Sequence, residues 1–206
     1  MSHGVRVTVF DYGAGNLHSL VKAVAAAGAA VRVERDPAAA VRDTDALVLP
    51  GVGGFAPAAE SLAPGRDAMR DAIAGGLPTL GICLGMQLLF DASEEGGGAG
   101  LGVIPGVVRR LASRRVPQIG WNALEDVRAD DPLLARAPLA VAYYANSYVC
   151  RPAEGDAPVI AWSTHDGDRF PAVVRRGRAV GAQFHPEKSS RAGLAFVRAW
   201  VEEASR

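Results

Sequence analysis

Short apolar runs, separated by turn residues or by stretches with helical spacing, dominate the first hundred residues. The runs are rich in β-branched residues, which predicts strands buried on both faces, and they lie at 5–10, 29–34, 46–49 and 78–82. Helical spacing between them predicts helices at about 16–27, 57–62 and 66–74. Because strands and helices alternate, this half of the chain predicts a parallel α/β sheet.

The second half is patterned differently, with strand candidates that follow one another through loops containing Gly, Asp and Pro. These candidates lie at 107–111, 139–144, 159–162, 172–176 and 179–184. With little helix between them, they predict antiparallel strands or a mixed extension of the sheet. The last segment, 190–204, carries Leu194, Val197, Trp200 and Val201 at helical spacing, which predicts a helix packed on the sheet.

We therefore expect an α/β fold with a mostly parallel central sheet, flanking helices and an antiparallel extension. No internal repeat and no long linker divides the sequence, which predicts a single domain over residues 1–206. The glycine-rich stretch 94–100 is the one low-complexity patch, and we expect it to be a flexible surface loop.

Charge and cysteine content narrow the classes of function. The 22 basic and 22 acidic residues give a net charge of zero, which argues against nucleic acid as a partner. No run of 18 apolar residues and no signal-peptide pattern occurs, so we expect a cytoplasmic protein with no membrane partner. Two cysteines, Cys83 and Cys150, suit neither a disulfide framework nor a zinc site, and we expect no metal and no cofactor.

The strongest chemical signal is the segment 80–87 (LGICLGMQ), in which an apolar strand ends in Gly-x-Cys-x-Gly. Small residues two positions on either side let the chain turn sharply and expose the side chain of Cys83, as in a nucleophile elbow. We expect a helix to follow and to continue through Leu88, Leu89 and Phe90, so that its N-terminus favours the thiolate. Cys83 as a small buried residue in a strand is the alternative.

A thiolate nucleophile needs a base, and His185 is the best candidate among the four histidines. His185 closes the apolar run 179–184 and is followed by Pro186 and Glu187. In an extended segment, the side chains of His185 and Glu187 project to the same side, so the carboxylate can orient the imidazole. Since the ends of two parallel strands can meet on one sheet, we expect His185 to face Cys83.

These residues resemble a known family. Residues 81–87 (GICLGMQ) and 183–187 (QFHPE) look like the Cys-His-Glu triad of class I glutamine amidotransferases. Further motifs resemble the glutaminase subunits of imidazole glycerol phosphate synthases; they are 11–17 (DYGAGNL), 50–55 (PGVGGF), 119–122 (IGWN) and 185–190 (HPEKSS). The resemblance runs from about residue 5 to residue 201 and implies a flavodoxin-like sheet.

The resemblance implies hydrolysis of glutamine to glutamate and ammonia, with Cys83 as nucleophile, His185 as proton donor to ammonia and Glu187 as its partner. It also implies an oxyanion hole made by the backbone N–H groups of Val52 and Leu84. Substrate-binding positions carried over from the family are Gly51, Gly53, Gln87, Asn146, Ser147 and Tyr148. The chain departs from the family at Asn146 and Gln118, where histidine is frequent, and this puts in doubt the detail of activation and partner contact.

The resemblance further implies a heterodimer with a (β/α)8-barrel cyclase subunit, which receives the ammonia and makes imidazole glycerol phosphate and AICAR in histidine biosynthesis. Candidate residues for the interface and the ammonia path are Asn16, Trp121, Asn122, Tyr143 and Lys188. Alone, the chain is expected to hydrolyse glutamine poorly, because the strand at Val52 stands in an inactive conformation. Alternatives are a subunit serving anthranilate, GMP, carbamoyl phosphate or pyridoxal phosphate synthesis, a non-catalytic binding module, and a cysteine peptidase or thiol sensor.

Overall fold

A seven-stranded sheet forms the centre of the protein. The computed structural model describes residues 4–13, 15, 17–155 and 158–206. The strands are β1 (Arg6–Phe10), β2 (Ala30–Glu34), β3 (Ala46–Leu49), β4 (Thr79–Ile82), β10 (Val159–His165), β11 (Asp168–Arg176) and β12 (Ala179–Ala182). Their order is β10-β11-β12-β4-β3-β1-β2, in which β2, β1, β3, β4 and β12 are parallel, β11 is antiparallel to β12, and β10 is antiparallel to β11. The expected parallel sheet with an antiparallel extension is confirmed.

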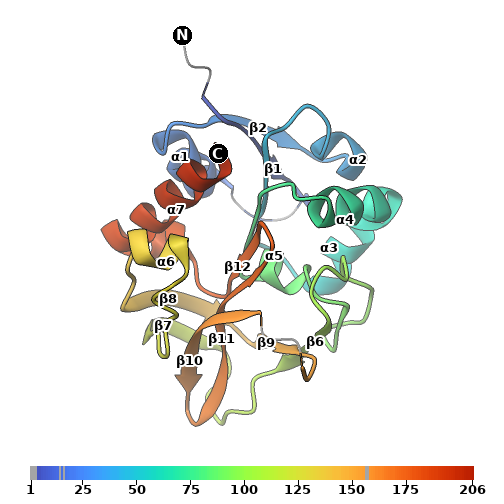
Figure 1. Ribbon diagram of the computed structural model, residues 1–206. Helices are drawn as coiled ribbons and strands as arrows, with labels where there is room; N and C mark the ends of the chain where they lie inside the picture. The colour runs from blue at the N-terminus through green and yellow to red at the C-terminus, as the bar shows by residue number, and fades with distance from the viewer. Residues whose placement is uncertain (1–3, 14, 16, 156–157) are drawn as a thin grey trace.

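Helices cover the two faces of this sheet (Figure 1). One face packs on α1 (His18–Ala26), α6 (Pro132–Arg136) and α7 (Ser190–Ala204), and the other on α2 (Pro37–Ala40), α3 (Phe55–Leu62) and α4 (Arg66–Ala74). A 3₁₀ turn, η1 (Ala63–Gly65), joins α3 to α4. Alternate strand residues enter different cores, because successive side chains point to opposite faces: Val48 lies in the first core, and Leu47 and Leu49 lie in the second.

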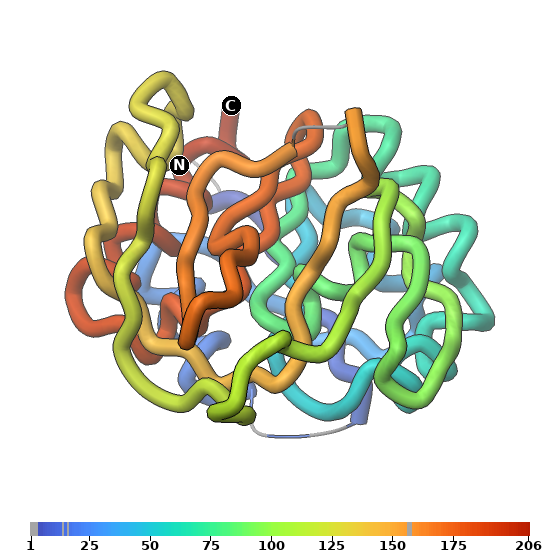
Figure 2. Tube along the Cα trace, turned by 90° about the horizontal axis from the view of Figure 1, so that it is seen from below, coloured from blue at the N-terminus to red at the C-terminus, as the bar shows by residue number. Residues whose placement is uncertain are grey.

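Two smaller sheets complete the molecule. β7 (Gln118–Ala123) and β8 (Val141–Asn146) form an antiparallel ribbon, and β5 (Ala92–Ser93), β6 (Gly106–Arg110) and β9 (Tyr148–Pro152) form a three-stranded sheet. Figure 2 shows the ribbon, in yellow-green and yellow, to the left of the orange strands β10 and β11, with β6 and β9 to their right. The sequence patterns did not predict β7, because its large apolar residues, Ile119 and Trp121, are exposed and its polar Gln118 is buried.

Two local expectations are wrong. The helix after Cys83, α5 (Leu84–Gln87), ends before Leu88, because residues 88–90 are all buried and their carbonyls accept hydrogen bonds from the N–H groups of 101, 104 and 102. Leu194 is 46% exposed, whereas Val197, Trp200 and Val201 are buried; the inward face of α7 is completed by Phe196 instead.

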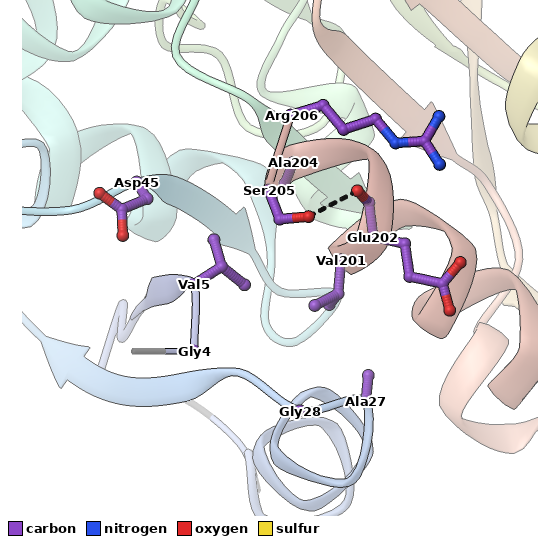
Figure 3. Close-up of a pocket in the computed structure, with 10 residues that line it drawn as sticks. All are labelled: Gly4, Val5, Ala27, Gly28, Asp45, Val201, Glu202, Ala204, Ser205 and Arg206. Carbon is purple, nitrogen blue, oxygen red and sulfur yellow. Dashed lines mark hydrogen bonds between the residues drawn. The ribbon is translucent and has the colours of Figure 1, made fainter. Parts of the chain in front are cut away.

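The two edges of the parallel sheet differ in their chemistry. The carboxyl ends of β3, β4 and β12 lead into Gly51, Cys83 and His185. The amino edge holds a cavity of about 590 Å³ where the ends of α1 and α7 meet the start of β1 (Figure 3). Every predicted triad residue therefore lies at the edge opposite to this larger cavity. No helix in the described part of the chain is both long enough and apolar enough to cross a membrane.

Candidate active site

Cys83 lies in a sharp turn between β4 and α5. Its backbone has φ 47° and ψ −105°, a region that costs a residue with a side chain about 1–3 kcal/mol. The flanking glycines permit this turn, because a Cβ at Gly81 would lie 2.6 Å from the carbonyl oxygen of Gly85 and one at Gly85 would lie 1.9 Å from that of Leu49. The Gly-x-Cys-x-Gly spacing therefore builds the sharp strand-to-helix turn that the sequence predicts.

The sheet brings His185 to this turn, since β12 pairs with β4 and places Ala182 beside Ile82. A Cβ added at Gly51 would lie 2.9 Å from Cys83 Cβ and 3.0 Å from His185 Cε1, so the thiol and the imidazole flank one small space. His185 is only 4% exposed and Cys83 only 7% exposed. Any side chain at position 51 would occupy the space between them.

Glu187 holds the other side of the imidazole. His185 Nδ1 and Glu187 Oε1 are 2.9 Å apart, with the two side chains 5% and 9% exposed. The expected extended geometry is wrong, because residues Pro186–Lys188 form a 3₁₀ turn, η2, in which the Lys188 N–H donates to the His185 carbonyl. Proline suits the first position of such a turn, which brings the carboxylate back to the ring.

The environment of His185 stabilises its charged form. Burial lowers the pKa of the imidazole, but the adjacent Cys83 and Glu187 outweigh it and raise the pKa from 6.5 to about 9. The ring is therefore protonated at neutral pH and can deliver a proton to a leaving group. Cys150 differs from Cys83, because it is fully buried in β9, where desolvation raises the pKa of its thiol.

A pocket of about 160 Å³ opens beside Cys83. Its lining residues are Gly51, Gly53, Cys83, Leu84, Gln87, Glu95, Ala145, Asn146, Ser147 and Tyr148. All the predicted substrate-binding positions belong to this set, as does Leu84 of the predicted oxyanion hole. Val52, the other predicted oxyanion residue, packs its side chain on Gly15, where an added Cβ would lie 2.6 Å from Val52 Cβ.

Two polar side chains at this site were missed from the sequence. Gln183 is fully buried, donates from Nε2 to Cys83 Sγ at 3.5 Å and accepts from Gln87 Nε2 at 3.4 Å. It stands two residues before His185, so the alternation that we applied to Glu187 could have identified it. Glu95 lies in the stretch predicted as a flexible loop, yet its Oε2 accepts from the N–H of Phe55, the first residue of α3, at 3.2 Å.

Comparison with known proteins agrees with this geometry. The family model described as glutamine amidotransferase class-I matches residues 8–202. The imidazole glycerol phosphate synthase subunit HisH of Symbiobacterium thermophilum is 48% identical over 95% of this chain and 92% of its own, and that of Halobacterium salinarum is 43% identical over 97% and 94%. Identity at this level over nearly the whole of both chains decides the family. The chain belongs to the HisH family of class-I glutamine amidotransferases.

Solved structures share the fold at lower identity. A glutamine amidotransferase superposes with a TM-score of 0.73 at 22% identity over 98% of this chain and all of its own. PurLQS from Thermotoga maritima superposes with a TM-score of 0.67 at 19% identity, covering 98% of this chain and 97% of its own. This chain thus shares the α/β architecture of these solved structures, as the strand patterns predict.

The predicted partner-facing residues of this HisH-family chain divide into two groups. Trp121 is 57% exposed and packs edge-on against Tyr143 with ring centroids 6.2 Å apart, and Lys188 is also exposed. Asn122 points to the other face of the ribbon, where its Nδ2 donates to the carbonyl of Thr164 at 2.9 Å. Asn16 lies outside the described residues.

The two positions that depart from the pattern expected for the HisH family are neighbours. Gln118 and Asn146 are cross-strand partners in β7 and β8, and both are buried. Asn146 Nδ2 donates to the Tyr148 carbonyl at 3.2 Å, while the amide oxygens of Gln118 and Asn146 are buried without a hydrogen-bond partner among the described residues.

Across all the residues that the structure describes, no group of three or more His, Cys, Asp and Glu side chains is arranged to hold a metal ion.

Proposed function

We propose that this chain hydrolyses glutamine through a glutamyl thioester on Cys83 and passes the ammonia to a (β/α)8-barrel cyclase subunit. That subunit would use the ammonia to make imidazole glycerol phosphate and AICAR in histidine biosynthesis. The observation that carries the proposal is the convergence of Cys83, His185 and Glu187 at one end of a small polar pocket. The names of the HisH relatives support the assignment to imidazole glycerol phosphate synthase.

The pocket has complementary groups for the two ends of glutamine. Glu95 presents a carboxylate that suits the α-ammonium group, and the backbone at Ser147 and Tyr148 offers polar atoms for the carboxylate end. Gln87 is fixed by its bond to the Tyr148 carbonyl at 3.0 Å, which ties the helix after the nucleophile to the wall of the pocket. With its α-ammonium and α-carboxylate groups held in this way, the substrate glutamine points its side-chain amide to Cys83 at the other end of the pocket.

The chemistry proceeds in two steps. The Cys83 sulfur attacks the amide carbon, the carbon–nitrogen bond breaks, and the His185 imidazolium gives its proton to the departing ammonia. Neutral His185 then takes a proton from water, whose oxygen attacks the thioester carbonyl and releases glutamate and the thiolate. Glu187 keeps the imidazole in one tautomer and orientation during both steps.

Charge on the tetrahedral intermediates needs two N–H donors. The N–H of Leu84 is the first after the nucleophile and stands at the start of α5, where the N–H groups lack partners within the helix. The second donor would be the N–H of Val52, brought in by rotation of its peptide. Gly53, at φ 95°, gives this segment the backbone freedom that such a rotation requires.

The outer face of the β7–β8 ribbon is the proposed docking surface for the cyclase subunit. Ile119 is 68% exposed and Val141 45% exposed, and together with Trp121 and Tyr143 they form an apolar face on two paired strands. Exposed aromatic anchors of this kind mark protein interfaces. Strand β8 of this ribbon continues into Ala145 and Asn146 of the pocket, so the docking face and the source of ammonia are contiguous.

The test uses the chain assembled with its cyclase subunit. Cys83→Ala should abolish glutamine-dependent synthesis while ammonium salts still support it, and Cys150→Ala serves as the matched control that retains both. Glutamine-dependent activity that persists in Cys83→Ala would refute the thioester mechanism. Failure of the wild-type pair to copurify, or to transfer ammonia from glutamine, would refute the partner assignment.

A further inference from the structure

A closed ring of hydrogen bonds joins the backbone of β8 to the backbone of His185. The Tyr143 N–H donates to Ser189 Oγ at 2.9 Å, Ser189 Oγ donates to the His185 carbonyl at 2.7 Å, and the His185 N–H donates to the Tyr143 carbonyl at 2.9 Å. Ser189 is a buried polar residue, only 1% exposed. Its hydroxyl thus stands between a strand of the proposed docking face and the triad.

The chemistry of the hydroxyl suits this bridging position. A serine hydroxyl has one hydrogen to donate and lone pairs to accept, and here it uses both at once. The N–H and carbonyl of Tyr143 both point away from β7, because they bond to Ser189 and His185. Segment 185–189 therefore lies against the edge of β8 that does not pair with β7. The N–H and the carbonyl of Tyr143 both hold it there.

The Tyr143 side chain connects the same residue to the surface. Its ring packs edge-on against Trp121, which is 57% exposed on the outer face of the ribbon. Direct contacts thus run from Trp121 to Tyr143, from Tyr143 to Ser189, and from Ser189 to His185. The surroundings of Ser189 are close-packed, because a Cβ at Gly193 of α7 would lie 2.6 Å from Ser189 Cβ. A displacement of β8 cannot be absorbed by empty space around the serine.

We propose that Ser189 is a positioning residue that transmits docking of the cyclase subunit on the β7–β8 ribbon to the imidazole of His185. The inference rests on the proposed function, since it needs a partner on that face. Docking fixes Trp121 and Tyr143, and the hydroxyl then holds the His185 backbone at the setting in which its ring faces Cys83. Without the hydroxyl, His185 keeps a single bond to β8, through its N–H.

The test compares Ser189→Ala with two control variants. Ser189→Thr restores a hydroxyl, and Ser190→Ala removes a neighbouring exposed hydroxyl that accepts a local bond from the Arg191 N–H. For each variant, kcat and KM for glutamine hydrolysis are measured in the isolated chain and in the complex with the cyclase subunit. The rate at which a glutamine-like chloroketone alkylates Cys83 is measured in the same two states, so that slow turnover in the isolated chain does not limit the comparison.

The cyclase subunit is expected to increase kcat and the alkylation rate of wild type. In Ser189→Ala, we expect this increase to be at least tenfold smaller than in wild type, with KM for glutamine changed less than twofold. Ser189→Thr should recover most of the increase, and Ser190→Ala should match wild type. An unchanged increase in Ser189→Ala overturns the proposal, and so does an equal loss in the isolated chain and the complex, which is the mark of a purely structural clamp. Wild-type protein that gains no activity from its partner would also overturn it, because Ser189 would have no signal to transmit, whereas failure of the wild-type pair to copurify or to transfer ammonia would refute the proposed function.

Discussion

Glu187→Gln tests the electrostatic design of the triad, because it keeps the shape of the side chain and removes its charge. In the native site, Glu187 Oε1 lies 2.9 Å from His185 Nδ1, and both side chains are almost fully buried. Glutamine can present an amide oxygen in the same place, so the hydrogen bond can survive. What is lost is the attraction of a buried carboxylate for the protonated ring.

The size of the effect follows from the pKa of His185. A rise in pKa from 6.5 to about 9 corresponds to about 3 kcal/mol in favour of the imidazolium. At pH 7.5, a group of pKa 9 is about 97% protonated and a group of pKa 6.5 about 9% protonated, so complete loss of the shift would cost about tenfold in reactive acid. Burial lowers this pKa while Cys83 also raises it, so tenfold is the scale of the loss expected from protonation alone.

The assay is the pH dependence of kcat for glutamine hydrolysis in the assembled complex. Wild type should lose activity as pH rises through about 9, where the imidazolium is titrated, and Glu187→Gln should lose it at lower pH. The stability of the fold should change with pH in the same direction. Because the pKa of His185 is higher in the folded state, its protonated ring stabilises the fold fully below pH 6.5, and this contribution disappears as pH rises through about 9. An alkaline limb that stays in place in Glu187→Gln would refute the assigned role of the carboxylate.

Two further substitutions follow from the contacts at the nucleophile and at the oxyanion strand. Gln183→Leu removes the N–H donor to Cys83 Sγ, so the rate at which iodoacetamide alkylates Cys83 at a fixed pH should fall, and an unchanged rate would contradict a role of Gln183 in holding the sulfur. Gly15→Ala places a Cβ 2.6 Å from Val52 Cβ and should lower kcat severalfold, whereas Gly13→Ala, at the similar φ of 81° but with open space around its Cβ, should not; equal losses would show that the clash is irrelevant.

The central sheet could be predicted because its strands are buried on both faces and appear as continuous apolar runs. Strands β3 and β4 lie within one residue of their predicted bounds, and α7 has the predicted bounds. The ribbon strand β7 could not be predicted in this way, since Ile119 and Trp121 are exposed and the buried position is the polar Gln118. Its pattern is inverted relative to a strand that packs its apolar side inward, and this agrees with the docking face proposed above.

The candidate site was predictable where backbone geometry dictates residue type. Gly81 and Gly85 lie so close to other backbone atoms that a side chain at either position would clash, so the Gly-x-Cys-x-Gly pattern predicts the turn at Cys83. Glu95 could not be placed, because it reaches the pocket through a bond to the start of α3 that joins positions 40 residues apart. The 3₁₀ turn at Pro186 is likewise set by packing against β8 and α7 and not by local alternation.

The most direct test of the account is the site of covalent labelling in the active complex. A glutamine-like chloroketone is added to the chain assembled with its cyclase subunit, and the modified peptide is identified by mass spectrometry as glutaminase activity falls. The account predicts one label per chain on Cys83, in step with the loss of activity, with Cys150 unmodified in its buried strand. Complete inactivation with Cys83 unlabelled would contradict it.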